Sequence, residues 1–473
     1  MLDIQPSIRH NDKDLDALAE FMAIKRDTLK PEILSKTAAG YTYLGQFIVH
    51  DISLDSQSQT LPWESPIAPS VNLRNPSFDL ETLYGINAGN TSAFLNQNSA
   101  ELKLGETSSD IASAIRDTFF QDLPRDENGM AMTLDGRNDE NLLVAQTHVA
   151  FIKFHNAIVS ETTGTDVSDV YKKARRRAIR HYQYIILNDF LPKIVKKSVL
   201  ADVIDNVNQF YKPVADDLFI PLEFSVAAFR MGHSMVRNSY HLNSRQSPRL
   251  SSLHIFTGRG GFTGQTNKLP SDWLIDWNSF YNLTGWQNPP DWRNPPDNFN
   301  FASKINTEIS SGLGKAHIFE PPSVDFKRGN SIPALDLYRT RFFNLPSGQM
   351  LAKEIVGEER QIGDSQKIAN LLPEDFNGVQ LKNVFKDNIP LWFYLLGEAQ
   401  INEDGENLGE VGSRIVAETF VELLRKSEFS ILDEPLLPNS EEFLGKPDGT
   451  FEMAEMLNYI NSKDSGFLNR VGA

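Results

Sequence analysis

The stretch GQFIVHDI, residues 45–52, is the part of the chain from which the fold can be predicted. Its apolar residues, among them Phe47 and Ile48, recur with helical spacing and predict a helix with one face against a core. Gln46 and His50 lie four residues apart, so they share one side of that helix. An imidazole held beside a second polar group suits proton transfer over a buried cofactor. The alternative is a core histidine whose ring is satisfied by a carbonyl group.

A second segment, DGRNDE at residues 135–140, precedes an apolar helix that we expect to end near residue 160. Arg137 and Glu140 lie three residues apart in its first turn and would share a face. A guanidinium at that place can donate hydrogen bonds to a bound oxygen anion. A surface ion pair is the alternative, because Glu140 also suits the dipole at the start of a helix.

A third segment, PLEFSVAAFRMGH at residues 221–233, predicts a helix that begins with Pro221. Phe229 and His233 would share a face of this helix, with Arg230 one turn before the histidine. The apolar surroundings predict that His233 is buried, and a buried imidazole is a good metal ligand when its second nitrogen has a partner. A core histidine without a ligand role is the alternative.

A loop with the sequence NPSFDLE, residues 75–81, carries oxygen-bearing side chains at every second position. These are Asn75, Ser77, Asp79 and Glu81. Such a set, with a carbonyl or two added, suits a hard cation such as calcium. A turn rich in aspartate and asparagine is the alternative.

Composition narrows the class of protein. The 473 residues suffice for one large domain or two ordinary ones. A formal net charge of -16 repels phosphate backbones, so we expect no nucleic-acid partner. The chain has no cysteine, which excludes disulfides, iron–sulfur clusters, thiolate-ligated haem and cysteine-based zinc sites.

The N-terminal residues MLDIQP contain no basic region followed by an apolar run, so no signal peptide is visible. No stretch reads as apolar for long enough to span a bilayer, and we expect no transmembrane segment. A cytoplasmic location is our expectation, with export without a leader as the alternative. The sequence leaves the oligomeric state open.

Nearly every apolar-periodic segment has a helical period and convincing alternating strands are absent, so the predicted fold is mainly α. We expect an N-terminal extension over residues 1–35 that packs on a main domain over residues 36–430. Residues 241–330 form a loop-rich insertion in that domain, and residues 431–473 form a peripheral C-terminal segment.

Other predicted helices cover residues 301–313, 390–399 and 412–424. A further long helix, residues 166–198, begins with a basic run over residues 172–180. We interpret this run as a solvated face, because the protein as a whole is acidic.

These segments together resemble one family. Five stretches are similar in order and spacing to the signatures of animal-type haem peroxidases: residues 45–51, residues 137–140 with the helix that ends at 154–156, residues 229–234, ALDLYRTR at 334–341 followed by residues 345–346, and GEVGSRIVAE at 409–418. This is the peroxidase–cyclooxygenase superfamily that includes myeloperoxidase, and the chain looks most like its bacterial branch. The resemblance covers about residues 30–430 and implies a single large helical haem peroxidase domain.

The resemblance implies haem b as the cofactor and a role for each matching residue. His233 looks like the proximal iron ligand, and Arg230 matches a residue that meets a haem propionate. On the opposite side His50 looks like the distal base, and Arg137 looks like its partner over the peroxide. Gln46 matches a glutamine of the distal pocket.

The chain departs from the family pattern at two haem contacts. Many relatives bond the haem through an aspartate just before the distal histidine and a glutamate in the arginine motif. Val49 replaces the aspartate and Glu140 is retained, so at most one ester bond, at Glu140, is expected. The partner of the proximal histidine is an asparagine in relatives, and our alignment places Gln349 there.

The resemblance also implies a calcium site. Asp51 and Asp79 match two calcium ligands of the family. Asn75, Ser77 and Glu81 stand at the remaining ligand positions of the loop, where Asn75 and Glu81 replace hydroxyl residues of relatives.

The function implied by the resemblance is that of a peroxidase. It would use hydrogen peroxide to oxidise halide, thiocyanate or small organic donors through a ferryl porphyrin radical. A fatty-acid dioxygenase of the same superfamily is one alternative, but that branch has a tyrosine where this chain has Arg230. A non-enzymatic haem-binding protein is another, and retention of Gln46, His50 and Arg137 together argues against it.

Overall fold

The computed structural model describes residues 10–23, 33–56, 71–85, 94–109, 119–206, 208–213, 218–258, 267–284, 298–314 and 328–468. Parts of the predicted insertion over residues 241–330 therefore lie outside the described residues. Within the described ranges helices dominate, and the strands form two small antiparallel pairs, β1 with β4 and β2 with β3. The predicted mainly α fold is confirmed.

The α-helices are α1 (Asp12–Met22), α2 (Gly40–Ile52), α3 (Glu81–Tyr84), α4 (Leu142–Val159), α5 (Val167–Ile185), α6 (Leu191–Ile194), α7 (Lys197–Asp205), α8 (Gly232–Met235), α9 (Ser311–Gly314), α10 (Ile332–Phe342), α11 (Gly348–Val356), α12 (Glu358–Ala369), α13 (Leu381–Phe385), α14 (Leu391–Asn402), α15 (Glu410–Lys426) and α16 (Met453–Lys463). The strands are β1 (Leu34–Ala38), β2 (Gly105–Glu106), β3 (Phe120–Asp122) and β4 (Phe301–Ser303). Two π-helical turns, η5 (Ile186–Phe190) and η6 (Glu223–Ala227), and two 3₁₀ turns, η4 (Gly136–Asp139) and η7 (Ala228–Met231), matter for the site.

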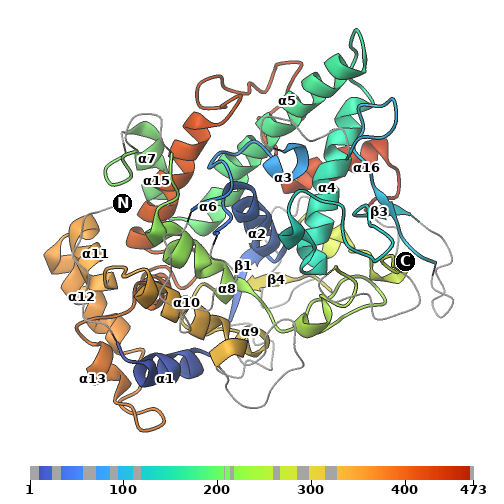
Figure 1. Ribbon diagram of the computed structural model, residues 1–473. Coiled ribbons are helices and arrows are strands. Elements are labelled where there is room, and N and C mark those ends of the chain that lie inside the picture. The colour runs from blue at the N-terminus through green and yellow to red at the C-terminus, as the bar shows by residue number, and fades with distance from the viewer. Residues whose placement is uncertain are drawn as a thin grey trace.

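Helix α2 lies near the middle of the molecule and contacts both α4 and α8 (Figure 1). It begins at Gly40, where a Cβ atom would lie 2.4 Å from the ring of Tyr281 and 2.7 Å from a backbone oxygen, so only glycine fits there. Its Phe47 is fully buried and stacks on Phe151 of α4 with ring centroids 4.8 Å apart. This apolar contact holds one side of α2 against α4, so the opposite side of α2 turns away from α4.

Helix α4 is buried nearly all round. By length and composition it could cross a membrane, with a mean hydropathy of 1.2, although the sequence suggested no such stretch. In the described structure 89% of this segment is buried inside the protein, which is typical of a core helix. Its N-cap is Asn141, whose side chain accepts a hydrogen bond from the backbone N–H of Val144.

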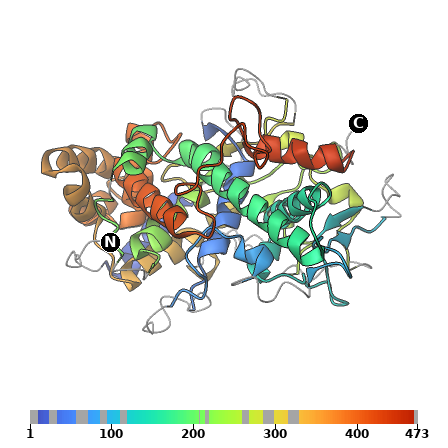
Figure 2. The same cartoon turned by 90° about the horizontal axis from the view of Figure 1, so that it is seen from above.

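Two predictions about the chain's periphery are wrong. The basic run of α5 is a solvated face only at Lys172 and Lys173, which are exposed. Arg175 pairs with Glu428 at 2.6 Å, and Arg180, with its side chain 1% exposed, donates to the carbonyl oxygen of Glu434 at 2.9 Å. The C-terminal segment that these arginines bind is not peripheral either. Its helix α16 packs on α4 with Met453 and Leu457 fully buried (Figure 2).

The predicted helix over residues 301–313 is also mostly wrong. Phe301–Ser303 form strand β4, which pairs with β1 near the N-terminal end of α2, and only Ser311–Gly314 are helical. Two predicted C-terminal helices correspond to α14 and α15.

The helix predicted to begin at Pro221 is broken into three kinds of turn. It passes from the π-helical η6 through the 3₁₀ turn η7 to the single α-helical turn α8. The break falls at Ala227, whose φ of -130° lies outside the helical range. Single π-helical turns are frequent at functional sites, and here the change of pitch sets the direction of Arg230 and His233.

Candidate functional site

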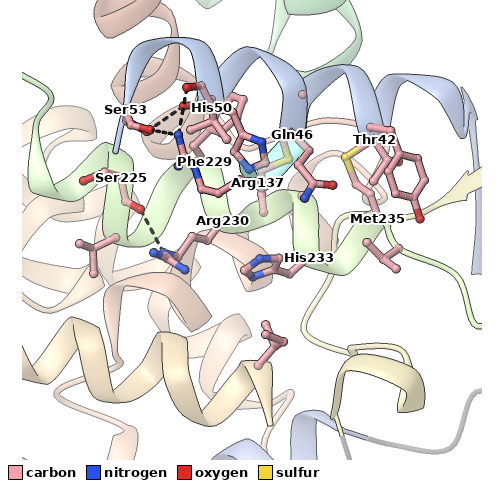
Figure 3. Close-up of a pocket in the computed structure, with 18 of the residues that line it drawn as sticks. Thr42, Gln46, His50, Ser53, Arg137, Ser225, Phe229, Arg230, His233 and Met235 are labelled. Carbon is pink, nitrogen blue, oxygen red and sulfur yellow. Dashed lines mark hydrogen bonds between the residues drawn. The ribbon is translucent and has the colours of Figure 1, made fainter. Parts of the chain in front are cut away.

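Six of the predicted site residues line one cavity of about 410 Å³. They are Gln46, His50, Arg137, Glu140, Arg230 and His233. Figure 3 shows Gln46 and His50 reaching from α2 on one side, with His233 and Arg230 on the other. The structure therefore brings together side chains from three segments that are far apart in the sequence.

The ring of His50 is oriented by a residue that the sequence did not single out. Its Nδ1 lies 2.8 Å from Oδ1 of Asn138, and Nδ2 of Asn138 lies 3.1 Å from Nδ1 of His148. Because the amide nitrogen donates to His148, the amide oxygen accepts from Nδ1–H of His50. This arrangement leaves the lone pair of His50 on Nε2.

His50 is held in its neutral form. Burial, together with the positive charge of Arg137, lowers the pKa of His50 to about 3. A neutral imidazole with a free Nε2 lone pair is a proton acceptor across the physiological pH range.

Arg137 is anchored by a carboxylate from its own turn. Asp135 caps η4 and accepts hydrogen bonds from Nε of Arg137 at 3.0 Å and from Nη2 at 2.7 Å. Nη2 also donates to the carbonyl oxygens of His50 and Ser53, as the dashed lines in Figure 3 show. Burial alone would raise the pKa of Asp135, but the hydrogen bonds and charge of Arg137 bring it well below its usual range. A fixed cation thus lies beside His50.

Gln46 and Glu140 form one hydrogen-bonded group on the same side of the cavity. Nε2 of Gln46 donates to Oε1 of Glu140 at 2.7 Å, and Nδ2 of Asn141 donates to Oε1 of Gln46 at 3.1 Å. Val49 also lines the cavity.

The partner of His233 is Asp336, and the predicted pairing with Gln349 is wrong. Nδ1 of His233 lies 2.6 Å from Oδ2 of Asp336, and the other carboxylate oxygen accepts from Nη1 of Arg230 at 2.8 Å. Gln349 lies on α11, where it bonds the backbone of Lys386 and Ile389. Helix α11 packs on α12, α14 and α15, so its residues are held away from α8.

The sequence did contain a signal for Asp336. It lies in the ALDLYRTR segment, three residues before Arg339, so both side chains share a face of α10. Arg339 lines the cavity too, and burial together with the nearby charge of Arg230 lowers its pKa to about 10. Two cations, Arg230 and Arg339, therefore stand on the His233 side.

The loop over residues 75–81 lies against Asp51, as the calcium prediction requires. The backbone N–H groups of Leu80 and Thr82 each donate to Asp51 at 3.1 Å, and Asn75 bonds both Ser77 and the carboxylate of Glu81. Yet nowhere in the described ranges do three aspartate, glutamate or histidine side chains converge as metal ligands. Asp51 and the predicted calcium ligands of the loop therefore lie near one another, but they are not arranged as a complete metal site.

Ionisation of Asp51 on α2 and of Asp79 in the loop is unfavourable, because both carboxyl groups are buried. Burial, together with the charges of Glu81 and Asp79, raises the pKa of Asp51 to about 8. Burial likewise raises the pKa of Asp79 to about 6, and among the described residues its Oδ1 has no hydrogen-bond partner.

The cavity fits a haem by the chemistry of its walls. His233 offers a nitrogen whose ring is oriented through Nδ1, as metal-binding histidines require. Arg230 and Arg339 can bind carboxylates such as propionates. Apolar side chains, among them Phe190 and Phe229, supply surface for a flat ring.

Comparison with known proteins agrees with this chemistry. Residues 67–262 match the family model for animal haem peroxidases. A chorion peroxidase of Aedes aegypti is 30% identical over 123 residues, which are 24% of this chain and 15% of that protein. A peroxidase-like protein of Margaritifera margaritifera is 30% identical over 115 residues, or 22% of this chain and 14% of that protein. The aligned segment is thus a small part of each relative's length.

Solved structures extend the similarity of fold over the whole chain. Peroxidase A from Dictyostelium discoideum has a TM-score of 0.55 at 17% identity, covering 100% of this chain and 90% of its own. A fatty acid alpha-dioxygenase from Oryza sativa has a TM-score of 0.53 at 13% identity, covering 98% and 80%. Membership of the bacterial branch stays a prediction. Residues 67–262 thus carry the match to animal haem peroxidases, and the chain has the mainly helical fold of these solved structures.

Proposed function

We propose that the chain is a haem-dependent peroxidase that uses hydrogen peroxide to oxidise halide, thiocyanate or small organic donors. One observation carries the proposal: His50, Arg137 and Gln46 line the same cavity as His233, which is oriented by a buried carboxylate. Retention of haem alone does not require a neutral base with an anchored cation beside it.

The haem would supply an iron that binds peroxide and takes up its oxidising equivalents. With haem in place, His50 would act through Nε2 as the base that accepts a proton from peroxide and returns it to the departing oxygen. Asn138 keeps Nδ1 of His50 protonated, so Nε2 stays a base. Arg137 stabilises the negative charge that develops as the O–O bond breaks. Asp336 would increase the electron donation of His233 by accepting a hydrogen bond from its Nδ1–H.

A fatty-acid dioxygenase is the second candidate, because solved dioxygenases share the fold. In that branch a tyrosine stands close before the proximal histidine. Here Arg230 occupies the position three residues before His233 and is engaged by Asp336 and the carbonyl oxygen of Ser225. Oxygen uptake with linoleate in the absence of peroxide would favour the dioxygenase. ABTS oxidation that requires peroxide would favour the peroxidase. If both activities are absent, the chain is a non-enzymatic haem-binding protein.

We expect His50→Ala to reduce peroxide-driven ABTS oxidation by roughly 10²–10⁴-fold, the usual contribution of a general base. The haem absorption band should persist, because His233 holds the iron. The matched control is His155→Gln, a buried imidazole that bonds Tyr84 and the carbonyl oxygen of Ala100 outside the cavity. A His50→Ala enzyme as fast as the control, per bound haem, contradicts the assignment.

We expect Asp336→Asn to raise the reduction potential of the bound iron. Asparagine keeps a hydrogen-bond acceptor for His233 but removes the charge that makes the ring a strong donor. Spectroelectrochemical titration measures the potential directly. Gln349→Ala is the control and should leave the potential unchanged. If Gln349→Ala changes the potential and Asp336→Asn does not, Gln349 is the partner of His233, as the sequence suggested.

We further propose at most one ester bond between haem and protein, at Glu140. The carboxylate lines the cavity and Val49 offers no second one. After acidified-acetone extraction, haem should remain on the wild-type polypeptide and be extracted fully from Glu140→Gln. Complete extraction from both proteins would make Glu140 a non-covalent neighbour.

We also propose that calcium binds Asp51 and the loop over residues 75–81. The folded-state pKa values of Asp51, about 8, and Asp79, about 6, lie above 3.8, so without a cation their contribution to stability is lost as pH rises from about 4 to 8. Calcium binds the ionised carboxylates and should offset this loss.

Added calcium should therefore raise the melting temperature more at pH 8 than at pH 5. At 100 times the dissociation constant the stabilisation would be about 2.7 kcal/mol. Thermal unfolding with calcium or EDTA tests this, with Asp79→Asn as the variant and a change of the exposed Asp433, Asp433→Asn, as its control. Equal melting temperatures with and without calcium at pH 8 would contradict the proposed calcium site.

A further inference from the structure

A buried tyrosine lies on the cavity wall, apart from the residues discussed above. Tyr41 belongs to the same helix as Gln46 and His50, lines the cavity and is buried. Its hydroxyl donates to both carboxylate oxygens of Asp189, at 2.8 Å and 3.0 Å. Asp189 is fully buried in the π-helical turn η5. The phenolic proton thus points at a built acceptor.

Asp189 is itself held in place from two sides. The ammonium group of Lys193 pairs with one oxygen, and the backbone N–H of Met453 donates to the other at 2.9 Å. The C-terminal segment therefore completes the surroundings of Asp189. These contacts fix the carboxylate within one hydrogen bond of the phenolic proton.

The nearby Tyr43 provides a contrast. It lines the same cavity and is equally buried. The polar groups that face its hydroxyl are Tyr240 and the cationic Arg237, and neither accepts a proton as a carboxylate does. A phenol that loses an electron becomes a very strong acid, so oxidation is favourable only where the proton can leave at the same time. Of these two tyrosines, only Tyr41 meets that condition.

Resting on the proposed peroxidase function, we propose that Tyr41 is a second redox site of this chain. Tyr41 gives one electron to the peroxide-oxidised haem while its phenolic O–H bond breaks and the proton passes to Asp189. The haem is reduced by one electron, and a neutral tyrosyl radical faces a protonated Asp189. An electron from a donor and the proton from Asp189 later restore the phenol.

Two contacts keep the radical neutral and at Tyr41. The ammonium nitrogen of Lys193 lies 4.6 Å from the centre of the Tyr41 ring and opposes positive charge there, so electron and proton must leave together. Tyr281 packs edge-on against Tyr41 with ring centroids 5.1 Å apart. Within the described structure the Tyr281 hydroxyl is buried without a hydrogen-bond partner, so it offers no equivalent route for a proton.

The test is electron paramagnetic resonance of haem-loaded protein, frozen after mixing with hydrogen peroxide and no donor. We expect a tyrosyl signal that narrows when the protein carries ring-deuterated tyrosine. Tyr41→Phe should lose the signal, and Asp189→Asn, which cannot take the proton, should lose it as well. Tyr43→Phe, from the same wall, should keep it. Melting temperatures show whether each variant is folded.

An unchanged tyrosyl signal in Tyr41→Phe, or its loss in Tyr43→Phe alone, would overturn the proposal. A wild-type protein whose haem spectrum responds to peroxide without any tyrosyl signal would also overturn it, while leaving the peroxidase function intact. If no protein changes its haem spectrum with peroxide, the proposed function itself fails.

Discussion

Asp336 is a carboxylate whose side chain is only 1% exposed, and each of its oxygens has a partner. One oxygen meets Nδ1 of His233 and the other meets Arg230, so a single group on α10 fixes two residues of the broken helical segment. Burial would raise the pKa of Asp336, but its contacts with His233 and Arg230 hold it below its ordinary value. An unpaired charge at this depth would be strongly destabilising. The direction of His233 is therefore tied to the stability of the fold.

The opposite wall uses the same principle with neutral groups. Asn138 accepts from His50 and donates to His148, so the tautomer of the base follows from a fixed amide. Arg137 is held by Asp135 in the adjoining turn. In both walls the reactive side chain is oriented by a second residue behind it, as general-base and metal-ligand histidines require.

The two π-helical turns both occur next to the cavity. Turn η5 places Asp189 under Tyr41, and η6 leads into the segment that carries His233. A regular α-helix would rotate these side chains to other directions, because each π-helical turn inserts an extra residue. Irregular helix is thus concentrated where the cavity needs particular orientations.

By itself the sequence determined the helical class, the resemblance to animal haem peroxidases and six of the residues that line the cavity. These follow from local patterns: helical periodicity and short motifs persist whatever the rest of the chain does. Only the tertiary structure decided that Asp336, 103 residues from His233, is its partner, and that Asn138 orients His50. It also decided that the arginines of α5 bind the C-terminal segment. Such pairings depend on which helix faces pack together, and no spacing along the chain records that choice.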